Sequence, residues 1–587
     1  MTMHKKRTGI GVICALVIGL GALSTAKAAK PESCAEITAA CKAAGFVQGG
    51  AAAGNGLMVD CVRPILMGTT PRKASLKLPA IDPQTVAACK SANPGMGQGK
   101  GRDDTSPAVE NATPQALPAD HPAPPGSPNI VFVLTDDLAM NMVQYMPHVL
   151  KMQRDGMTFA RYFVTDSLCC PSRTSIFTGE FPHDSGVFRN GGDDGGFGAF
   201  MSHRDDQRSF AVALQRGGYK TAMLGKYLNG YRPEKNGVPT GWNEWDVAGN
   251  GYPEFNYSLN QDGKVVQYGS DPQDYLTDVL SGLAVKFIRE SAGAPFFIEV
   301  ATFAPHAPYI PAPRDADAFP GLQAPRTLAY NAAPDASMPK WLSEFPPLSD
   351  DDMARIDKEF RMRAQSVQAV DKMIGDLQAA VAAAGQERNT YFIFSSDNGY
   401  HMGEHRMRPG KMTAFDTDIQ VPLVVTGPGI APGRTLGEIA ENIDLCPTIA
   451  ELAGTAPPAN VDGHSLVPLL RGVPVADWRS VALVEHHNPR DDKDDPDAPA
   501  KRSGNPTGYE AIRLPNSLYV EYHDGAAEYH DLATDPDELH NTVSLLSAEQ
   551  RASLSATVKA MTNCHDAQSC WTASHAAPGL VSAAAPR

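Results

Sequence analysis

The sequence predicts an α/β sandwich around a largely parallel central sheet, followed by a small antiparallel sheet subdomain. Helical patterns separate apolar runs of the kind found in strands that are buried on both faces. These runs lie at residues 129–134, 221–224, 295–301, 391–394 and 421–425. The clearest helix is expected from residue 350 to 384, with Ser349 as N-cap and Gly385 as its stop. Such alternation of strands and helices is typical of a parallel sheet covered by helices.

The smaller sheet is expected near the C-terminus. Residues 511–532 have the pattern of short strands, with turns at residues 515–516 and 524–525. The acidic stretch that precedes them, residues 491–497, is interpreted as a solvated loop.

The N-terminus has the pattern of an export signal. A basic segment, residues 5–7, precedes an apolar stretch that ends near Leu23, and residues 26–28 form a small-x-small cleavage site. We therefore expect a signal peptide at residues 1–28, a periplasmic or secreted protein, and no stable membrane insertion after cleavage. An uncleaved anchor is the alternative, although the apolar run is short for a spanning helix.

The ten cysteines suit an exported protein, in which disulfides form readily. Disulfides are expected among the cysteines at positions 34, 41, 61 and 89, and a zinc site is the alternative there. A C-terminal pair, Cys564 and Cys570, can form another disulfide. The expected regions after the signal are a cysteine-containing module (29–90), a Pro/Gly-rich linker (91–128), a catalytic domain (129–470), an antiparallel subdomain (471–550) and a tail (551–587).

The formal net charge of −15 argues against a general nucleic-acid binder, whose surface would be basic. It also gives no long-range attraction for an anionic substrate. A few local cations must therefore hold any such substrate.

Polar pairs follow two of the predicted strands at their carboxyl ends. Asp136 and Asp137 follow one strand, and Asp397 and Asn398 follow another. Adjacent carboxylates repel each other, so they persist best around a cation. An all-oxygen set of ligands suits Ca²⁺ or Mg²⁺ better than zinc. The alternative is that each pair is only a turn or a helix cap.

A cysteine motif, Ser-Leu-Cys169-Cys170-Pro171-Ser-Arg173, carries the most specific signal. Because Pro171 suits the first turn of a helix, Cys169 would lie at the positive end of the helix dipole. A buried cysteine, a disulfide partner and a thiolate nucleophile are the other interpretations.

This motif, with Thr-Gly179 beyond it, resembles the signature of type I, formylglycine-dependent sulfatases of the alkaline phosphatase superfamily. The resemblance extends from Asn129 to about Asn541 and implies an alkaline-phosphatase-like fold. Further matching motifs lie at residues 136–137, 225–226, 305–308, 396–399, 411–422, 442–448, 462–466 and 529–538.

The resemblance implies that Cys169 is oxidised to formylglycine (3-oxoalanine) by a formylglycine-generating maturation enzyme. One hydroxyl of the hydrated aldehyde then attacks sulfur and expels the alcohol, which leaves a sulfate hemiester on the enzyme. Loss of a proton from the second hydroxyl expels sulfate and regenerates the aldehyde.

The resemblance also implies roles for residues that match the family motifs. Arg173 steadies the hydrated aldehyde, Lys226 and Lys411 hold sulfate oxygens, and His306 protonates the leaving alcohol. The ligands of Ca²⁺, or alternatively Mg²⁺, are residue 169 together with Asp136, Asp137, Asp397 and Asn398.

One departure from the family leaves the base that opens the hemiester undetermined. Many relatives have Gly-Lys-x-His where this chain has Gly-Lys-Tyr-Leu-Asn at residues 225–229. His183, just beyond the nucleophile helix, is one candidate, and His401 and His405 are others. The i,i+4 spacing of the last two would also permit a zinc site, which we do not favour beside Asp397.

The motifs are most similar to the N-acetylglucosamine-6-sulfatase and heparan 6-O-endosulfatase branch. This similarity implies a sulfuric ester hydrolase that acts on a sulfated small molecule or glycan, such as a sulfated amino sugar. The alternatives are a phosphonate or phosphate monoester hydrolase with the same formylglycine, and a catalytically dead protein that binds sulfated glycans.

Overall fold

The structure is a computed structural model that describes residues 32–46, 61–62, 64–65, 76–82, 84–86, 89, 114, 117–488 and 497–575. The chain forms two compact units, one ending at Thr105 and the other beginning at Ser106. The signal peptide expected at residues 1–28 lies outside the described residues.

The first unit has a small hydrophobic core that contains a disulfide. Helix α1 (Glu32–Ala43) buries Ile37 and Cys41, which pack with Phe46. Cys41 is bonded to Cys61. A disulfide is therefore present where the sequence predicted a cysteine-stapled module.

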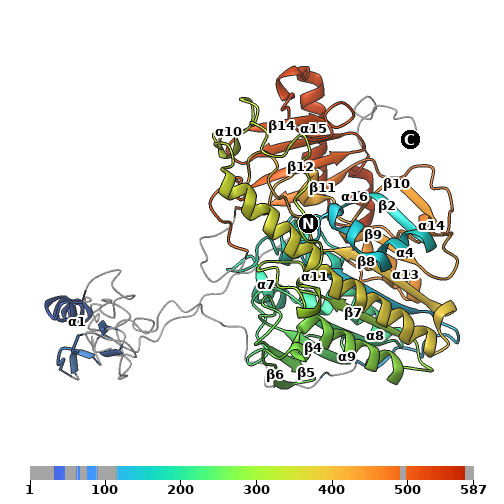
Figure 1. Ribbon diagram of the computed structural model, residues 1–587, viewed down its shortest axis with the longest axis horizontal. Helices are drawn as coiled ribbons and strands as arrows, with labels where there is room; N and C mark the ends of the chain where they lie inside the picture. The colour runs from blue at the N-terminus through green and yellow to red at the C-terminus, as the bar shows by residue number, and fades with distance from the viewer. Residues whose placement is uncertain are drawn as a thin grey trace, which may run out of the picture. The chain divides into compact units, whose positions relative to one another are not determined.

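The second unit contains a ten-stranded sheet in the order β10-β2-β9-β8-β1-β7-β3-β4-β5-β6 (Figure 1). The central strands are parallel, since β1 pairs with β7 and β8, and β3 pairs with β7 and β4. Strands β9, β5 and β6 are antiparallel to their neighbours. The predicted, largely parallel sheet is confirmed. The strands are β1 (Asn129–Thr135), β2 (Met157–Phe163), β3 (Lys220–Lys226), β4 (Glu244–Ala248), β5 (Ser258–Gln261), β6 (Lys264–Gln267), β7 (Phe296–Ala301), β8 (Thr390–Ser396), β9 (Leu423–Thr426) and β10 (Arg434–Glu441).

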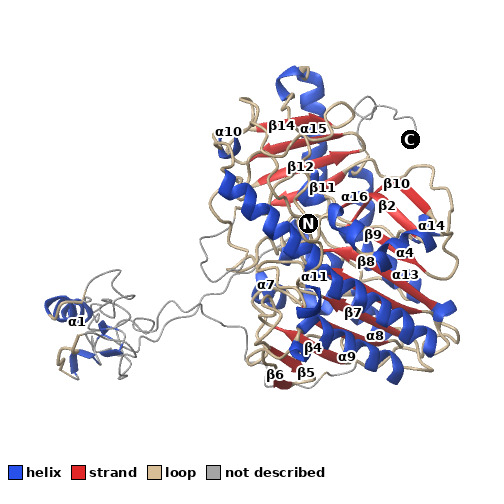
Figure 2. Cartoon of the chain, in the orientation of Figure 1, coloured by secondary structure: helices blue, strands red, loops and turns tan. Residues whose placement is uncertain are grey.

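Helices cover both faces of this sheet, because alternate residues of each buried strand point to opposite sides (Figure 2). In β1, Phe132 faces one core and Val133 faces the other. The first core is completed by α5 (Cys169–Thr178), α8 (Phe210–Arg216) and α13 (Leu445–Ala453). The second core is completed by α4 (Pro147–Asp155), α9 (Leu276–Glu290) and α11 (Asp350–Ala383).

The long helix α11 begins and ends where the sequence predicted. Ser349 accepts a hydrogen bond from the backbone of Asp352, and the Asp352 side chain accepts one in return, so both form a capping box. Gly385, just past the end, has φ +68°, a left-handed conformation that suits glycine.

The C-terminal sheet is antiparallel, as predicted, in the order β11-β12-β13-β14. Its strands are β11 (Ala482–His486), β12 (Tyr509–Leu514), β13 (Ser517–Tyr522) and β14 (Ala527–Asp531). One of its faces packs against α15 (Ala548–Met561) and α16 (Ala567–Ala573). The Cys564–Cys570 disulfide joins the turn after α15 to α16. The described part of the region expected as a tail is helical and completes a core, and the expected start of that region lies inside α15.

Shorter elements connect these layers. The remaining helices of the second unit are α6 (Pro182–Ser185), α7 (Gly196–Ser202), α10 (Lys340–Ser343), α12 (Asp416–Ile419) and α14 (Val467–Leu470). The 3₁₀ helices are η3 (Met140–Tyr145), η4 (Asp205–Arg208), η5 (Pro272–Asp274), η6 (Pro313–Asp315), η7 (Glu387–Asn389), η8 (Asn442–Asp444) and η9 (Val543–Leu545). Among the described residues, none of the helices has the length and apolar character needed to cross a membrane.

The last part of the predicted linker packs on the second unit. The backbone of Leu117 donates to Gln215 Oε1, and that of Asp120 donates to the carbonyl of Arg216. Residues 117–120 are therefore hydrogen-bonded to the end of α8 and are part of the folded second unit.

Gly225 permits the close pairing of β3 with β7. It has φ +94°, and a Cβ there would lie 1.9 Å from the carbonyl oxygen of Ala301. We expect Gly225→Ala to destabilise the protein by about 2–5 kcal/mol through backbone strain and overpacking. Gly282→Ala, in an open part of α9, should instead stabilise it by up to about 1 kcal/mol. Thermal unfolding of the two variants checks this, and equal midpoints would contradict it.

Candidate active site

Four polar residues predicted as metal ligands meet at the carboxyl ends of two neighbouring parallel strands. Thr135 of β1 and Ser396 of β8 are register partners, so the residues that follow them lie side by side. The backbone N–H of Asp137 donates to Asp397 Oδ1 at 3.1 Å. Ligand sites in open α/β sheets form at such strand ends.

Cys169 begins α5 beside these carboxylates. Its Sγ donates to Asp136 Oδ1 at 3.2 Å, and both side chains are fully buried. Burial, followed by the neighbouring Asp136 and Asp397, raises the pKa of the thiol well above its usual value. Such a thiol stays protonated, unlike the low-pKa thiolates of cysteine nucleophiles.

The donor set fits a hard divalent cation. Potential ligand atoms of Asp136, Asp137 and Cys169 lie within 4.8 Å of one another, and a ring nitrogen of His306 lies within the same distance of them. Asn398 donates through Nδ2 to Asp137 Oδ1 at 2.6 Å, while its buried Oδ1 has no hydrogen-bond partner among the described residues. An amide oxygen left over among buried carboxylates is the kind of ligand that Ca²⁺ or Mg²⁺ takes.

Two buried lysines neutralise the carboxylates. Lys226 Nζ donates to Asp136 Oδ2 at 2.6 Å. Lys411 Nζ donates to Asp137 Oδ1 at 2.7 Å and to Cys169 Sγ at 2.9 Å. Burial alone would lower both lysine pKa values, but the carboxylates raise them well above the usual value, so both ammonium groups stay charged.

Arg173 ties the nucleophile helix to the strand ends. Its Nε donates to Asp397 Oδ2 at 2.7 Å, and its Nη1 donates to the carbonyl of Lys226 at 2.8 Å. Burial would raise the pKa of Asp397, but Arg173, Lys226 and Lys411 lower it to about 2. The Asp397 carboxylate is therefore charged at every working pH.

His306, in the loop after β7, is doubly protonated in this setting. Its Nδ1 lies 2.7 Å from the carbonyl oxygen of Ala307, and its Nε2 lies 2.6 Å from Asp497 Oδ1. Since both partners are acceptors, both ring nitrogens must carry hydrogen. Burial would lower the pKa of His306, but Asp137, Asp497 and Asp136 raise it to about 9.

Asp497 is the site residue that the sequence did not reveal. The acidic stretch it belongs to was interpreted as a solvated loop, yet its side chain is only 1% exposed and pairs with His306 and Lys411. That interpretation is wrong for this residue. Local composition could not show a contact made with residues so distant along the chain.

Comparison with known proteins decides the family. A sequence model described as sulfatase matches residues 128–455, and one described as N-sulphoglucosamine sulphohydrolase, C-terminal, matches residues 403–564. The human protein N-acetylglucosamine-6-sulfatase is 34% identical over 72% of this chain and 82% of its own length. The chain belongs to the sulfatase family. It is accordingly a sulfuric ester hydrolase.

Other relatives and solved structures agree on the fold. A putative extracellular sulfatase Sulf-1 homolog of Caenorhabditis elegans is 34% identical over 61% of this sulfatase and 52% of its own length. A structure solved with its substrate, D-glucosamine-2-N,6-O-disulfate, superposes with a TM-score of 0.62 at 22% identity, covering 74% of this chain and 97% of the other. The phosphonate monoester hydrolase of Agrobacterium radiobacter gives 0.56 at 20% identity, covering 74% and 95%. Sulfatases in general use formylglycine and a divalent metal, which the buried donor set of this chain suits.

The sulfatase does not bring His183 to the Cys169 cluster. His183 Nδ1 lies 2.8 Å from Glu485 Oε2, and its Nε2 lies 2.8 Å from the carbonyl oxygen of Cys564. These contacts join α6 to the C-terminal subdomain. The structure thus gives His183 an ion pair with Glu485, and these contacts do not support a role as the base.

The other two candidate histidines also have partners outside the cluster. His401 Nδ1 pairs with Asp418 at 2.9 Å, and the His405 ring stacks on Phe415. Burial lowers the pKa of His405 to about 3, so it is neutral. The groups that do reach the side chain of residue 169 are the Asp136 carboxylate and the Lys411 ammonium.

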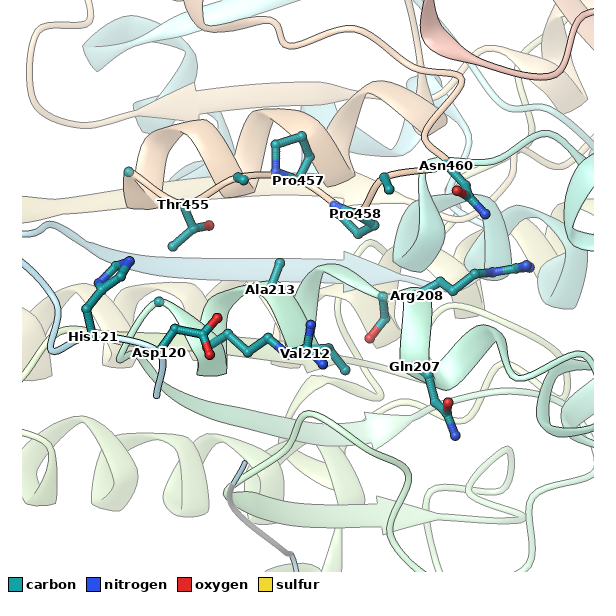
Figure 3. Close-up of a pocket in the computed structure, with 16 residues that line it drawn as sticks. Asp120, His121, Gln207, Arg208, Val212, Ala213, Thr455, Pro457, Pro458 and Asn460 are labelled. Atoms are coloured by element: carbon teal, nitrogen blue, oxygen red, sulfur yellow. The ribbon is translucent and has the colours of Figure 1, made fainter. Parts of the chain in front are cut away.

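A cavity of about 260 Å³ adjoins the cluster. Asp137, His306, Lys411 and Asp497 line it, together with Tyr309, Arg355, Glu359, Tyr400 and Arg408. Figure 3 shows another cavity of about 510 Å³, whose lining includes Asp120, Arg208 and Asn460. The lining of this second cavity includes none of the clustered residues, so the first is the candidate entry for substrate.

The position of His183 predicts a pH-dependent stabilisation. Burial would lower its pKa, but Glu485 and then Cys564 O raise it to about 9, above the unfolded value of about 6.5. The stabilisation is therefore complete below about pH 6.5 and is lost as pH rises through about 9. We expect His183→Gln to cost up to about 3 kcal/mol at pH 6 and little at pH 10, with turnover retained.

Denaturant unfolding across this pH range measures the effect. His540→Gln is the matched control. The His540 side chain is 65% exposed, and its ring nitrogen lies 3.5 Å from the Asp335 carboxylate. A gap between wild type and His183→Gln that is constant with pH, or loss of turnover in a folded variant, would refute the assignment.

Proposed function

We propose that this sulfatase hydrolyses the sulfate ester of a sulfated amino sugar, of the N-acetylglucosamine-6-sulfate type, through a formylglycine made from Cys169 beside Ca²⁺. The observation that carries the proposal is the meeting of Cys169, paired carboxylates and Lys411 in one buried cluster. A divalent ion held by these carboxylates would supply positive charge to stabilise the sulfuryl group. A hydrated aldehyde at position 169 supplies the attacking hydroxyl and a second hydroxyl for release of sulfate.

The side chains of the cluster divide the remaining work. Lys411 lies within hydrogen-bond distance of both residue 169 and Asp137, so it can orient the nucleophile and meet negative charge on the sulfuryl oxygens. Lys226 is held on the Asp136 side for the same purpose. His306 carries a transferable proton on Nε2, which suits protonation of the leaving alcohol.

The substrate class is inferred from relatives and from the entry cavity. N-acetylglucosamine-6-sulfatase is among the relatives of this chain, and the fold is shared with a protein solved with a sulfated glucosamine. Tyr309 and Tyr400 line the cavity together with charged Arg355 and Glu359. Aromatic and polar groups in one pocket suit the apolar face and hydroxyls of a sugar.

We also propose that the protein is exported and matured by a formylglycine-generating enzyme. The disulfides Cys41–Cys61 and Cys564–Cys570 support an oxidising compartment, either the periplasm or the exterior.

Substitution of the two adjacent cysteines tests the nucleophile. We expect Cys169→Ala to abolish turnover of nitrophenyl sulfate, whereas Cys170→Ala, which changes a side chain of the apolar core, should retain it. The wild type should turn over nitrophenyl sulfate faster than nitrophenyl phosphate. Mass spectrometry of the peptide with residue 169 should show formylglycine in place of cysteine. Equal loss of turnover in both variants, or full activity with an unmodified thiol at residue 169, would refute the mechanism.

Chelation tests the cation. Removing the metal removes the bonds that it forms with buried oxygens of the folded protein, so we expect EDTA to abolish turnover and to lower the thermal midpoint. Adding Ca²⁺ back to the stripped enzyme should restore both turnover and the thermal midpoint, and calorimetric titration measures the affinity.

Asn398→Ala should weaken Ca²⁺ binding by at least about tenfold, since one neutral ligand oxygen is lost. Asn563→Ala, at an exposed position, is the control, and equal affinities in the two variants would count against the site.

A further inference from the structure

Asp497 lines the entry cavity and is held by at least four donors. Its Oδ1 lies 2.6 Å from His306 Nε2 and 2.7 Å from Lys411 Nζ. Its Oδ2 accepts from Asn190 Nδ2 at 2.7 Å and from Asn229 Nδ2 at 3.1 Å. All of these side chains are buried, so the chain builds a cradle with two donors for each oxygen of an anion.

Two of these donors are the ones that a sulfate ester needs. Lys411 Nζ contacts Asp497 Oδ1 at 2.7 Å and the side chain of residue 169 at 2.9 Å, so one ammonium is shared by the carboxylate and the nucleophile position. The Nε2 proton of His306 is directed at Asp497. It cannot be given to a leaving alcohol while that contact lasts.

The charges of Asp497 and of the substrate are the same. A carboxylate and a sulfate monoester each carry one negative charge and each present at least two acceptor oxygens. The ester can therefore take the place of the carboxylate on Lys411 and His306 without leaving any of the buried cations unpaired. Two anions on the same pair of donors would instead repel each other.

We propose that Asp497 is an internal competitor of the substrate: its carboxylate occupies the cradle that receives the sulfuryl group and must leave it before an ester binds. This inference rests on the sulfatase function proposed above. The contact of Asp497 with Lys411 and His306 is then autoinhibitory. When Asp497 leaves, the side-chain amides of Asn190 and Asn229 become available as donors to the substrate.

The test uses the matured, Ca²⁺-loaded full chain and inorganic sulfate as the probe. Asp497→Asn keeps the shape of the side chain and removes its charge, so calorimetry should show sulfate binding tightened by about tenfold, in the range of one charged hydrogen bond. The KM for nitrophenyl sulfate should fall by a similar factor, with kcat within about twofold of wild type. Asp477→Asn, at a side chain that is 88% exposed, should change neither value.

Each other outcome has a defined meaning. Weaker sulfate binding or a raised KM in Asp497→Asn would overturn the proposal, since Asp497 would then hold the substrate, and unchanged values would overturn it as well. Asp497→Ser is measured alongside in case the first variant does not fold. Because the sulfate titration needs no turnover, a wild type that fails to cleave sulfate esters would refute the proposed function separately.

Discussion

The active site depends on one buried ion pair, between Arg173 and Asp397. Both side chains are fully buried, and their atoms lie 2.7 Å apart. The same guanidinium donates to the carbonyl of Lys226, so one residue of α5 fixes the ends of β8 and β3 together. Breaking such a pair by removing one partner costs about 3–5 kcal/mol, because the other charge is left buried and alone. The position of residue 169, one helical turn before Arg173, follows from this anchor.

The sequence was sufficient for the parts of the site that follow from strand ends. Asp136 and Asp397 could be predicted as neighbours, because each follows a buried apolar run and parallel strands present their carboxyl ends at one edge. The limits of α11 could be predicted too, since Ser349 and Gly385 act on the backbone next to them. In both cases the signal and its structural effect are close together in the chain.

Contacts between distant segments could not be predicted in this way. His183 follows the nucleophile helix closely in sequence, but the chain turns at Gly179, with φ +76°, and carries His183 to Glu485. Asp497 shows the opposite case, since an acidic, Pro-containing stretch is ordinarily solvated and only the folded chain places this residue against His306. The family motifs pointed to Cys169 as the candidate nucleophile but carried no information on either residue.

The charges of the cluster explain why a monoanionic ester suits it. Four cations face four carboxylates, namely Arg173, Lys226, Lys411 and His306 against Asp136, Asp137, Asp397 and Asp497. Exchange of Asp497 for a sulfate monoester preserves this balance. A phosphate monoester carries about −1.5 to −2 charges near neutral pH, so its exchange for Asp497 would change the net charge of the cluster. Exchange of one monoanion for another leaves the net charge of the cluster unchanged, with or without a bound divalent cation, so a sulfate ester can pair with Lys411 and His306 as Asp497 does.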